Sequence, residues 1–441
     1  MAQSISKLLL VAMLASAAAA PVFSTDGVHP LTLAECVKIA EAHQPDLAVS
    51  QAMVRVAEAR LRAAHAVFLP RVDLGASYIR QSYNFAAQPG TTPRQVQLFS
   101  SPERFTSAPY YFAGLNASQT VYDFGRSRAT VSRGEFDLAA SRQNLRRQRN
   151  LVFLNVRSAY FGVLAAEELV RIRQEAVGNQ GKHLDQVRAF YEVGRRPKID
   201  VTRQEVALAN TEVDLRQARE DLDVAKAALA TSMGLSIEQA PEPVNVLRQE
   251  QQYASLGQLL AEAERNRPDL ESLRDQLAAT QADMIAARSN FRPTIGLSSF
   301  FDYRNLKFPL IYNWSLGALL AQNLFAGGAD RALIAQVAAQ QDATRAELTS
   351  LLQRVRQEVF TAQADLQVAH DKIGLAIKTE GEARENMALA EGRYQAAYGN
   401  IIELTDAQLV DVSSKAQEVQ ARYDYQVAAA RLDAALGREV K

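Results

Sequence analysis

The longest regular pattern in the chain is a row of small and apolar residues spaced alternately four and three positions apart. It comprises Val152, Val156, Ala159, Val163, Ala166 and Val170 in the first half, and Val355, Val359, Ala362, Leu366, Ala369 and Ile373 in the second. A period of about 3.5 residues is typical of helices packed as coiled coils. The helical pattern runs to about Tyr191 and Tyr394, which predicts helices on the order of 100 Å long at about 1.5 Å per residue. We therefore expect a bundle or a wall of long helices.

A second pattern is alternation of apolar and polar residues, which predicts strands. It covers Val72–Tyr78, Tyr111–Val121, Ile295–Phe301 and Tyr312–Leu320, and it forms two hairpins. The first hairpin has a loop rich in Pro, Gln, Ser and Thr at about residues 84–107, and the second has a short turn. Each strand is roughly 10–14 residues long, enough for a tilted membrane crossing, and aromatic residues near the loop ends resemble an interfacial girdle. The alternative is a soluble two-hairpin sheet with one core face.

The two halves of the chain are copies of one unit. Residues 33–47 match 256–270, both ending in Pro-Asp-Leu, and Phe68-x-Pro70 matches Phe291-x-Pro293. Gln119 and Gly125 likewise match Gln322 and Gly328, and residues 224–234 match 427–437. Similarity between generic Ala-rich helices does not explain the paired Pro-Asp-Leu and Phe-x-Pro marks. We expect a first repeat over residues 25–240 and a second over 241–441, joined by a polar linker at about residues 240–253.

Glycine and proline mark where the predicted helices begin and end. Each copy opens with a short helix, at about residues 33–42 and 256–264, and a second helix follows that ends before Pro70 or Pro293. Gly194 and Gly399 are expected to let the chain reverse between the long helices. The return helices are expected to end at Gly234 and Gly437 as C-caps.

Residues 1–24 read as a signal peptide, because Lys7 precedes an apolar run, Leu8–Ala20, that is too short to span a bilayer. A short membrane anchor is the alternative. No later apolar stretch is long enough for a spanning helix, so a membrane crossing would have to use strands. Zero formal net charge argues against a nucleic-acid partner. The single cysteine, Cys36, excludes an intrachain disulfide.

The sequence shows no pattern that carries catalysis. The five histidines are scattered without ligand spacing, and neither a Gly-rich phosphate loop nor a nucleophile elbow is present. We therefore expect no enzyme activity, no cofactor and no metal site.

Four strands cannot close a barrel, and an open sheet edge in a bilayer leaves backbone groups unpaired. If several chains share one barrel, no sheet edge is left open. Two chains would give a barrel of eight strands with little lumen, whereas three chains would give twelve strands and an open duct.

With these features the sequence resembles the TolC-like outer membrane efflux proteins. The resemblance rests on the duplicated Pro-Asp-Leu helices, on the two Phe-x-Pro marks, on Tyr122-Asp-Phe-Gly125 and Leu324-Phe-Ala-Gly-Gly328, and on the paired tips. It implies an α+β membrane protein built from a two-fold repeated unit of long α-helical hairpins and β-hairpins. It further implies a homotrimer with a 12-stranded β-barrel in the cell outer membrane, continued by an α-helical periplasmic tunnel.

The implied function is that of a passive exit duct in a tripartite efflux or type I secretion system. The implied partners are a periplasmic adaptor (membrane fusion) protein, an inner-membrane RND, MFS or ABC transporter, and outer membrane lipid. A periplasmic coiled-coil structural or tethering protein is the alternative function.

The resemblance also assigns residues at the tips. Glu403 and Asp406, one turn apart on a helix, match the acidic pore aperture, where six carboxylates in a trimer would favour cations. Their alternative role is to complement the dipole at the helix N-terminus.

Tyr394 and Asp200 match the links that hold the closed gate. Gly399 stands where the family has a basic residue five positions after the tyrosine. Arg195, Arg196 or Arg203 could take over the role of that basic residue. One specific possibility is a pair between Arg203 and Asp406 of neighbouring hairpins. The tips that contact the adaptor match Arg188, Val193, Gly194 and Gly399. The alternative for each of these residues is ordinary turn chemistry in solvent.

Overall fold

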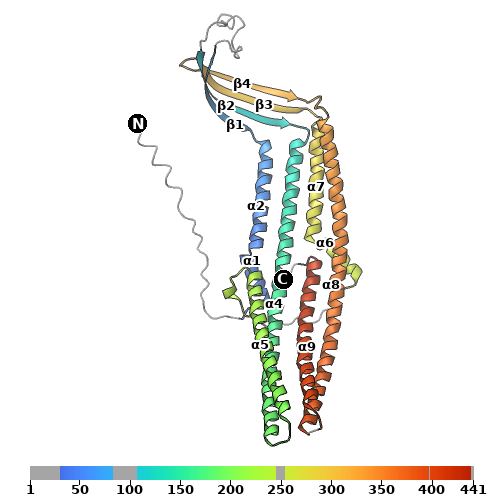
Figure 1. Cartoon of the computed structure of the whole chain (residues 1–441). Coiled ribbons are helices and arrows are strands. Elements are labelled where there is room, and N and C mark those ends of the chain that lie inside the picture. Colours follow the sequence, from blue (N-terminus) through green and yellow to red (C-terminus); the bar gives the residue numbers. More distant parts are fainter. Residues whose placement is uncertain (1–29, 83–106, 245–253, 397, 439–441) are drawn as a thin grey trace, which may run out of the picture.

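The computed structural model describes residues 30–82, 107–244, 254–396 and 398–438. The chain is elongated, with a β-sheet at one end and two helical hairpin tips at the other (Figure 1). The predicted signal peptide, the loop of the first β-hairpin and most of the predicted linker lie outside the described residues. In the described part, none of the helices has a stretch long and apolar enough to cross a membrane.

Both copies form the same four α-helices and two β-strands in the same order, and the first copy has two additional short 3₁₀ helices. The first contains α1 (Leu33–His43), α2 (Pro45–His65), η1 (Ala66–Phe68), β1 (Arg71–Ser82), β2 (Ser107–Tyr122), α4 (Arg126–Glu192), α5 (Lys198–Ser232) and η2 (Ile237–Gln239). The second contains α6 (Leu256–Asn266), α7 (Pro268–Ser289), β3 (Thr294–Asn305), β4 (Ile311–Ala321), α8 (Ala329–Gln395) and α9 (Ile401–Ala435). Helices α4 and α8 each have 67 residues, and α5 and α9 each have 35. The long helices predicted from the heptad pattern are confirmed.

The four strands form one antiparallel sheet in the order β1-β2-β3-β4. The sheet joins the two copies, because Ser118 of β2 lies opposite Ser298 of β3. Alternation along each strand separates two faces. One face carries exposed Leu74, Leu297, Trp314 and Leu316, and the other carries Asp73, Asn116, Ser298 and Asn313. An apolar face and a polar face are what the wall of a membrane duct requires.

The helices form a wall around α4 (Figure 1). Helix α4 packs on α2 and α7 and also on α5 and α9, while α8 packs on α7 and α9. The predicted seam lies in this core, since Val156, Val163, Val355 and Val359 have no exposed surface. Small seam residues such as Ala166 let the helix backbones approach closely.

The ends of the return helices carry their predicted glycine caps. Gly234 and Gly437 have φ angles of 75° and 70°, in the left-handed region that favours glycine. A Cβ at Gly234 would lie 2.6 Å from the carbonyl oxygen of His43, and one at Gly437 would lie 2.9 Å from Cα of Arg267. These glycines therefore also let each return helix meet the junction between the two short helices of its own copy.

Near the middle of the wall, two polar contacts join segments far apart in sequence. The buried guanidinium of Arg157 on α4 lies 3.4 Å from the carboxylate of Asp433 on α9. The buried hydroxyl of Tyr160 donates to the carbonyl oxygens of Leu31 (3.2 Å) and Val244 (2.5 Å). The first contact joins the two repeats, and the second holds Leu31, near the start of the first repeat, and Val244, just after its end, against α4.

Candidate functional site: the paired helical tips

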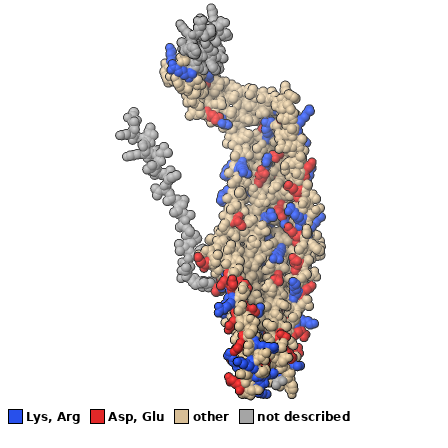
Figure 2. All heavy atoms as spheres, viewed as in Figure 1, with Lys and Arg blue, Asp and Glu red and all other residues tan. Residues whose placement is uncertain are grey.

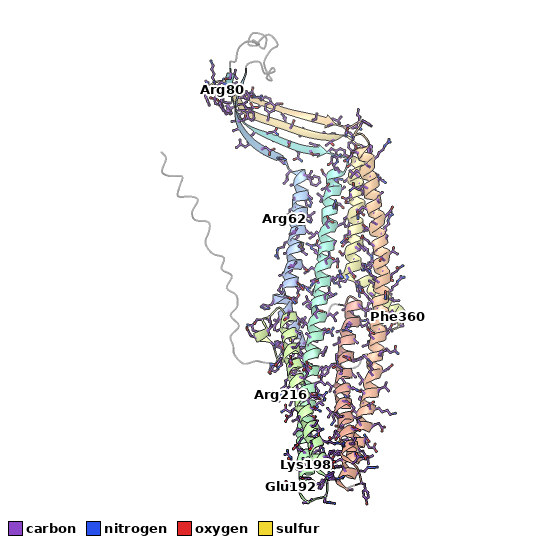
Figure 3. All side chains as sticks on the ribbon, in the orientation of Figure 1. Arg62, Arg80, Glu192, Lys198, Arg216 and Phe360 are labelled. Atoms are coloured by element: carbon purple, nitrogen blue, oxygen red, sulfur yellow. The ribbon has the colours of Figure 1, made fainter. Side chains whose placement is uncertain are left out.

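Each long helical hairpin ends in a tight turn at the end of the molecule opposite the sheet. Charged side chains of both signs gather there, whereas the visible face of the sheet carries few (Figure 2). In the first tip, Gly194 follows α4 with a φ of 74°, and Pro197 is the N-cap of α5. Figure 3 labels Glu192 and Lys198, which flank this turn at the ends of the two helices.

The second tip turns differently. Gly399 does not have a positive φ, so the expectation that it reverses the chain through backbone freedom needs correction. A Cβ at this position would lie 3.1 Å from the backbone nitrogen of Tyr394 and 3.2 Å from Cβ of Arg393. The close approach of the end of α8 therefore favours glycine here, because a larger residue would push its neighbours aside by a few tenths of an ångström. Asn400 then caps α9, its side-chain oxygen accepting from the backbone N–H of Glu403 at 2.8 Å.

Arg196 joins the two tips within one chain. From the turn between α4 and α5, its guanidinium donates to the carbonyl oxygens of Tyr394 (2.9 Å) and Gly399 (3.2 Å). The same guanidinium lies over the Tyr394 ring, 4.3 Å from the centroid. A planar guanidinium can stack and donate at once, which an ammonium cannot do in this way. The sequence pointed to this residue only as one of three basic candidates.

Below this contact lies a small apolar core that unites the hairpins. It consists of buried Val187, Tyr394, Ile401 and Leu404, with Phe190, Val201 and Met387 packed against it. Tyr394 is only 2% exposed, so the tips are fixed by packing as well as by Arg196.

Of the predicted gate pair, Tyr394 on α8 lies in this core, and Asp200 on α5 is buried and near enough for its charge to act on Tyr394. Burial and the negative charge of Asp200 raise the pKa of Tyr394, and the cation of Arg196 acts in the opposite direction. The Tyr394 hydroxyl has no hydrogen-bond partner among the described residues. An unsatisfied buried hydroxyl is a point where the tip core is less stable than full packing would allow.

The two predicted aperture acids occupy different surroundings. Glu403 is half-buried and pairs with Arg393 of its own hairpin, with Nε and Oε1 3.2 Å apart. Asp406 is exposed and lies with Arg203 along a groove of about 530 Å³ between α5 and α9. Within the described part of this chain no ion pair joins Arg203 to Asp406, and the pair expected between neighbouring hairpins stays a prediction.

The predicted adaptor-contact residues all lie at or beside the tips. Val193 is 68% exposed at the end of α4, and Arg188 pairs with Glu205 across the first hairpin at 2.8 Å. Sequence reasoning missed Tyr398, which is 86% exposed on the second tip. It also missed a buried hydrogen bond between the side chains of Gln204 and Gln180, which links α5 to α4. A polar residue at a seam position was the available signal for that bond.

The described residues contain no group of three or more His, Cys, Asp or Glu side chains arranged to hold a metal ion. The single thiol, Cys36, is buried, and burial raises its pKa to about 12. This thiol is therefore neutral and inert at ordinary pH.

Comparison with known proteins agrees with this architecture. The sequence is 26% identical over 415 residues to the pyoverdine export outer membrane protein OpmQ of Pseudomonas putida, covering 92% of this chain and 85% of that protein. It is 24% identical over 335 residues to the cation efflux system protein CusC of Escherichia coli, covering 74% and 73%.

Solved structures show the same fold. The outer-membrane channel OprN matches with a TM-score of 0.80 at 21% identity, covering 92% of this chain and 90% of that one. The outer membrane protein VceC of Vibrio cholerae matches with a TM-score of 0.79 at 20% identity, covering 92% and 96%. The family described as "Outer membrane efflux protein" matches residues 36–235 and 259–438, one match in each repeat. The chain therefore belongs to the outer membrane efflux protein family.

Proposed function

We propose that three copies of this outer-membrane protein form the passive exit duct of a tripartite efflux or type I secretion system. The observation that carries the proposal is the sheet. It has an apolar face, a polar face and two open edges, and it stands on a wall of helices that ends in paired tips. Closing those edges with further copies gives a barrel whose polar face lines a lumen. A periplasmic coiled-coil tether has no use for such a sheet.

The duct itself performs no chemistry, so energy comes from its partners. We propose that the tips dock a periplasmic adaptor, which links the duct to an energised RND, MFS or ABC transporter of the inner membrane. Exposed Val193 and Tyr398, with Arg188 close by, supply apolar and charged groups for this contact. The division of the chain into two repeats near residue 240 is part of the same proposal, since each repeat supplies one tip.

We further propose that the tips are the gate. Arg196, Tyr394 and Asp200 hold the hairpins together, and Glu403 and Asp406 place carboxylates where the tunnel is narrowest. Two acids per copy give six negative groups in a trimer, which would favour cations and bind divalent cations.

Purification from the outer membrane in detergent tests the duct. We expect trimers by light scattering and ion-conducting channels in planar bilayers. Restored export in a strain that lacks its own exit duct, supplied with the matching adaptor and transporter, is the corresponding result in cells. A monomeric periplasmic protein without channel activity would contradict the proposal.

A further inference from the structure

A groove of about 530 Å³ lies between α5 and α9 where the two helices leave the tips (Figure 1). Both helices pack on α4, and Gln180 of α4 contributes to the lining. We propose that this groove binds a zwitterionic amphiphile, a solute with an ammonium group and a carboxylate at one end and an apolar body. The inference rests on the proposed duct, because Asp406 belongs to its proposed aperture, and it names a class of solute that the duct would contact.

The apolar walls of the groove come from equivalent positions of the two repeats. Helices α5 and α9 have 35 residues each and both begin directly after a tip, so their residues correspond position by position. Ile199 corresponds to Ile402 and Val206 to Leu409, and all four line the groove. Their exposed fractions run from 49% for Ile402 to 61% for Leu409. Exposed apolar side chains gathered in one groove indicate a binding surface.

Between these two apolar pairs lies an equivalent pair of opposite charge, Arg203 on α5 and Asp406 on α9. Among the described residues neither side chain has an ion-pair or hydrogen-bond partner. Asp214, the other acid of the lining, already pairs with Arg173 at 3.2 Å. A ligand that carries both charges can pair with Arg203 and Asp406 together. A ligand with one charge would pair with one of them and be repelled by the other.

A buried amide beside the groove is a second, independent sign of a ligand. The groove adjoins a smaller cavity of about 50 Å³, and the two share Gln180, Thr211, Asp214 and Leu409. Gln408 lines the smaller cavity and is only 5% exposed, yet neither atom of its amide has a hydrogen-bond partner in the described structure. Buried polar groups are normally hydrogen-bonded. This amide can serve a polar group in the body of a ligand, such as an amide or a sulfonamide.

These features define how the ligand would lie. Its ammonium would contact Asp406, its carboxylate would contact Arg203, and its apolar body would lie along Val206 and Leu409 beside Gln408. The size of the groove fits a small solute, because small-molecule sites have volumes of about 300–1,000 Å³.

Three fluorescent ligands that share one dansyl group test the class of ligand. Nε-dansyl-lysine carries an ammonium and a carboxylate, dansylcadaverine carries only the ammonium, and dansyl-aminocaproate carries only the carboxylate. Dansyl emission rises in apolar surroundings, so titration of the full-length trimer in detergent gives each Kd, with protein-free micelles as the blank. We expect the zwitterion to bind about tenfold more tightly than either singly charged ligand, because each of those lacks one charged contact.

Matched variants assign the two charges. Arg203→Gln should weaken binding of Nε-dansyl-lysine about tenfold without weakening that of dansylcadaverine. Asp406→Asn should weaken the zwitterion equally without weakening dansyl-aminocaproate. Leu409→Asn should weaken all three ligands, whereas Val224→Asn, which changes an exposed valine of α5 outside the groove, is the control and should weaken none. Equal affinity for the three ligands, or unchanged binding in both charge variants, would overturn the proposal.

A neighbouring subunit is the alternative occupant of the groove. Val206→Cys, in a chain whose own thiol is removed by Cys36→Ala, decides between the two. We expect this thiol to react rapidly with a maleimide in the intact trimer and to be protected by Nε-dansyl-lysine. A thiol that stays unreactive without ligand would mean that the assembly covers the groove, which would overturn the proposal.

Failure of this proposal is distinguishable from failure of the duct. Trimeric channels that bind none of the three ligands would remove the solute site alone. A monomeric protein without channel activity would remove the duct and, with it, the role of the groove in contacting an exported solute.

Discussion

The guanidinium of Arg196 lies 4.3 Å from the centre of the Tyr394 ring and donates a 2.9 Å hydrogen bond to the carbonyl oxygen of the same residue. One side chain of the first hairpin thus holds both the ring and the backbone of the second. A further bond to the carbonyl of Gly399, at 3.2 Å, extends this hold to the other side of the turn. The contact joins the tips of the two helical hairpins, one from each repeat.

Removing this contact should open the tips. We expect Arg196→Ala to raise single-channel conductance in planar bilayers, because hydrogen bonds to a charged group contribute roughly 1.5–3 kcal/mol. Arg196→Lys should behave more like Ala than like Arg, since an ammonium cannot combine the stacking with both bonds. Arg195→Ala is the matched control, because Arg195 lies over Phe190 at 5.8 Å within its own tip. Equal conductance in Arg196→Ala and Arg195→Ala channels would contradict the clamp.

The Tyr394 hydroxyl should contribute little to stability, although its ring contributes much. The hydroxyl is buried without a hydrogen-bond partner in the described structure, so Tyr394→Phe should leave the Tm of the assembly unchanged or slightly raised. Tyr394→Ala should lower stability by about 3–5 kcal/mol, because it empties the tip core. Differential scanning calorimetry in detergent measures both. A large loss of stability in Tyr394→Phe would show that the hydroxyl has a partner in the assembled duct.

The acids of the second tip should control ion passage. We expect Glu403→Ala combined with Asp406→Ala to raise conductance and to weaken block by divalent cations, because the negative charge at the proposed aperture is lost. Glu418→Ala, which removes an acid farther along α9 that pairs with Arg422, is the control. Unchanged conductance and unchanged block in the double variant would mean that Glu403 and Asp406 only complement the helix dipole at the N-terminus of α9.

Stability should fall at alkaline pH, partly through Tyr160. Burial raises the pKa of Tyr160 to about 12, well above the value near 10 of an unfolded tyrosine. The folded chain therefore holds this proton more tightly, so its contribution is complete below about pH 10 and declines between about pH 10 and 12. Thermal unfolding of wild type and Tyr160→Phe across this range should show a smaller alkaline decline in the variant. Parallel declines would mean that Tyr160 is not responsible.

Much of the fold follows from periodicity and from the repeat. The seam through Val156 and Val359, the alternating strands, and the glycine caps at Gly234 and Gly437 were all predicted from residues whose local chemistry is decisive. The heptad row required long packed helices, and the duplicated marks required that each element occur twice.

The site was less predictable, because its contacts are tertiary. Sequence reasoning attributed Gly399 to backbone freedom, whereas the structure shows a close approach to Tyr394 and Arg393. The sequence could not decide which of three arginines joins the tips. Only the packing of one tip on the other shows that Arg196 reaches the two carbonyl oxygens. The pairing of Glu403 with Arg393 depends in the same way on how tightly the second tip turns.

Gly399 stands in the second tip where Arg196 stands in the first, and Tyr191 stands where Tyr394 stands. Tyr191 is 44% exposed, and no residue of the described chain covers it as Arg196 covers Tyr394. In a ring of subunits, each junction between the two tips of one subunit would contain Arg196. Each junction between tips of neighbouring subunits would contain Gly399 at the equivalent position. We therefore expect the tip end of the duct to open at the three junctions between subunits. Each subunit would move as a rigid body, with its two tips held together.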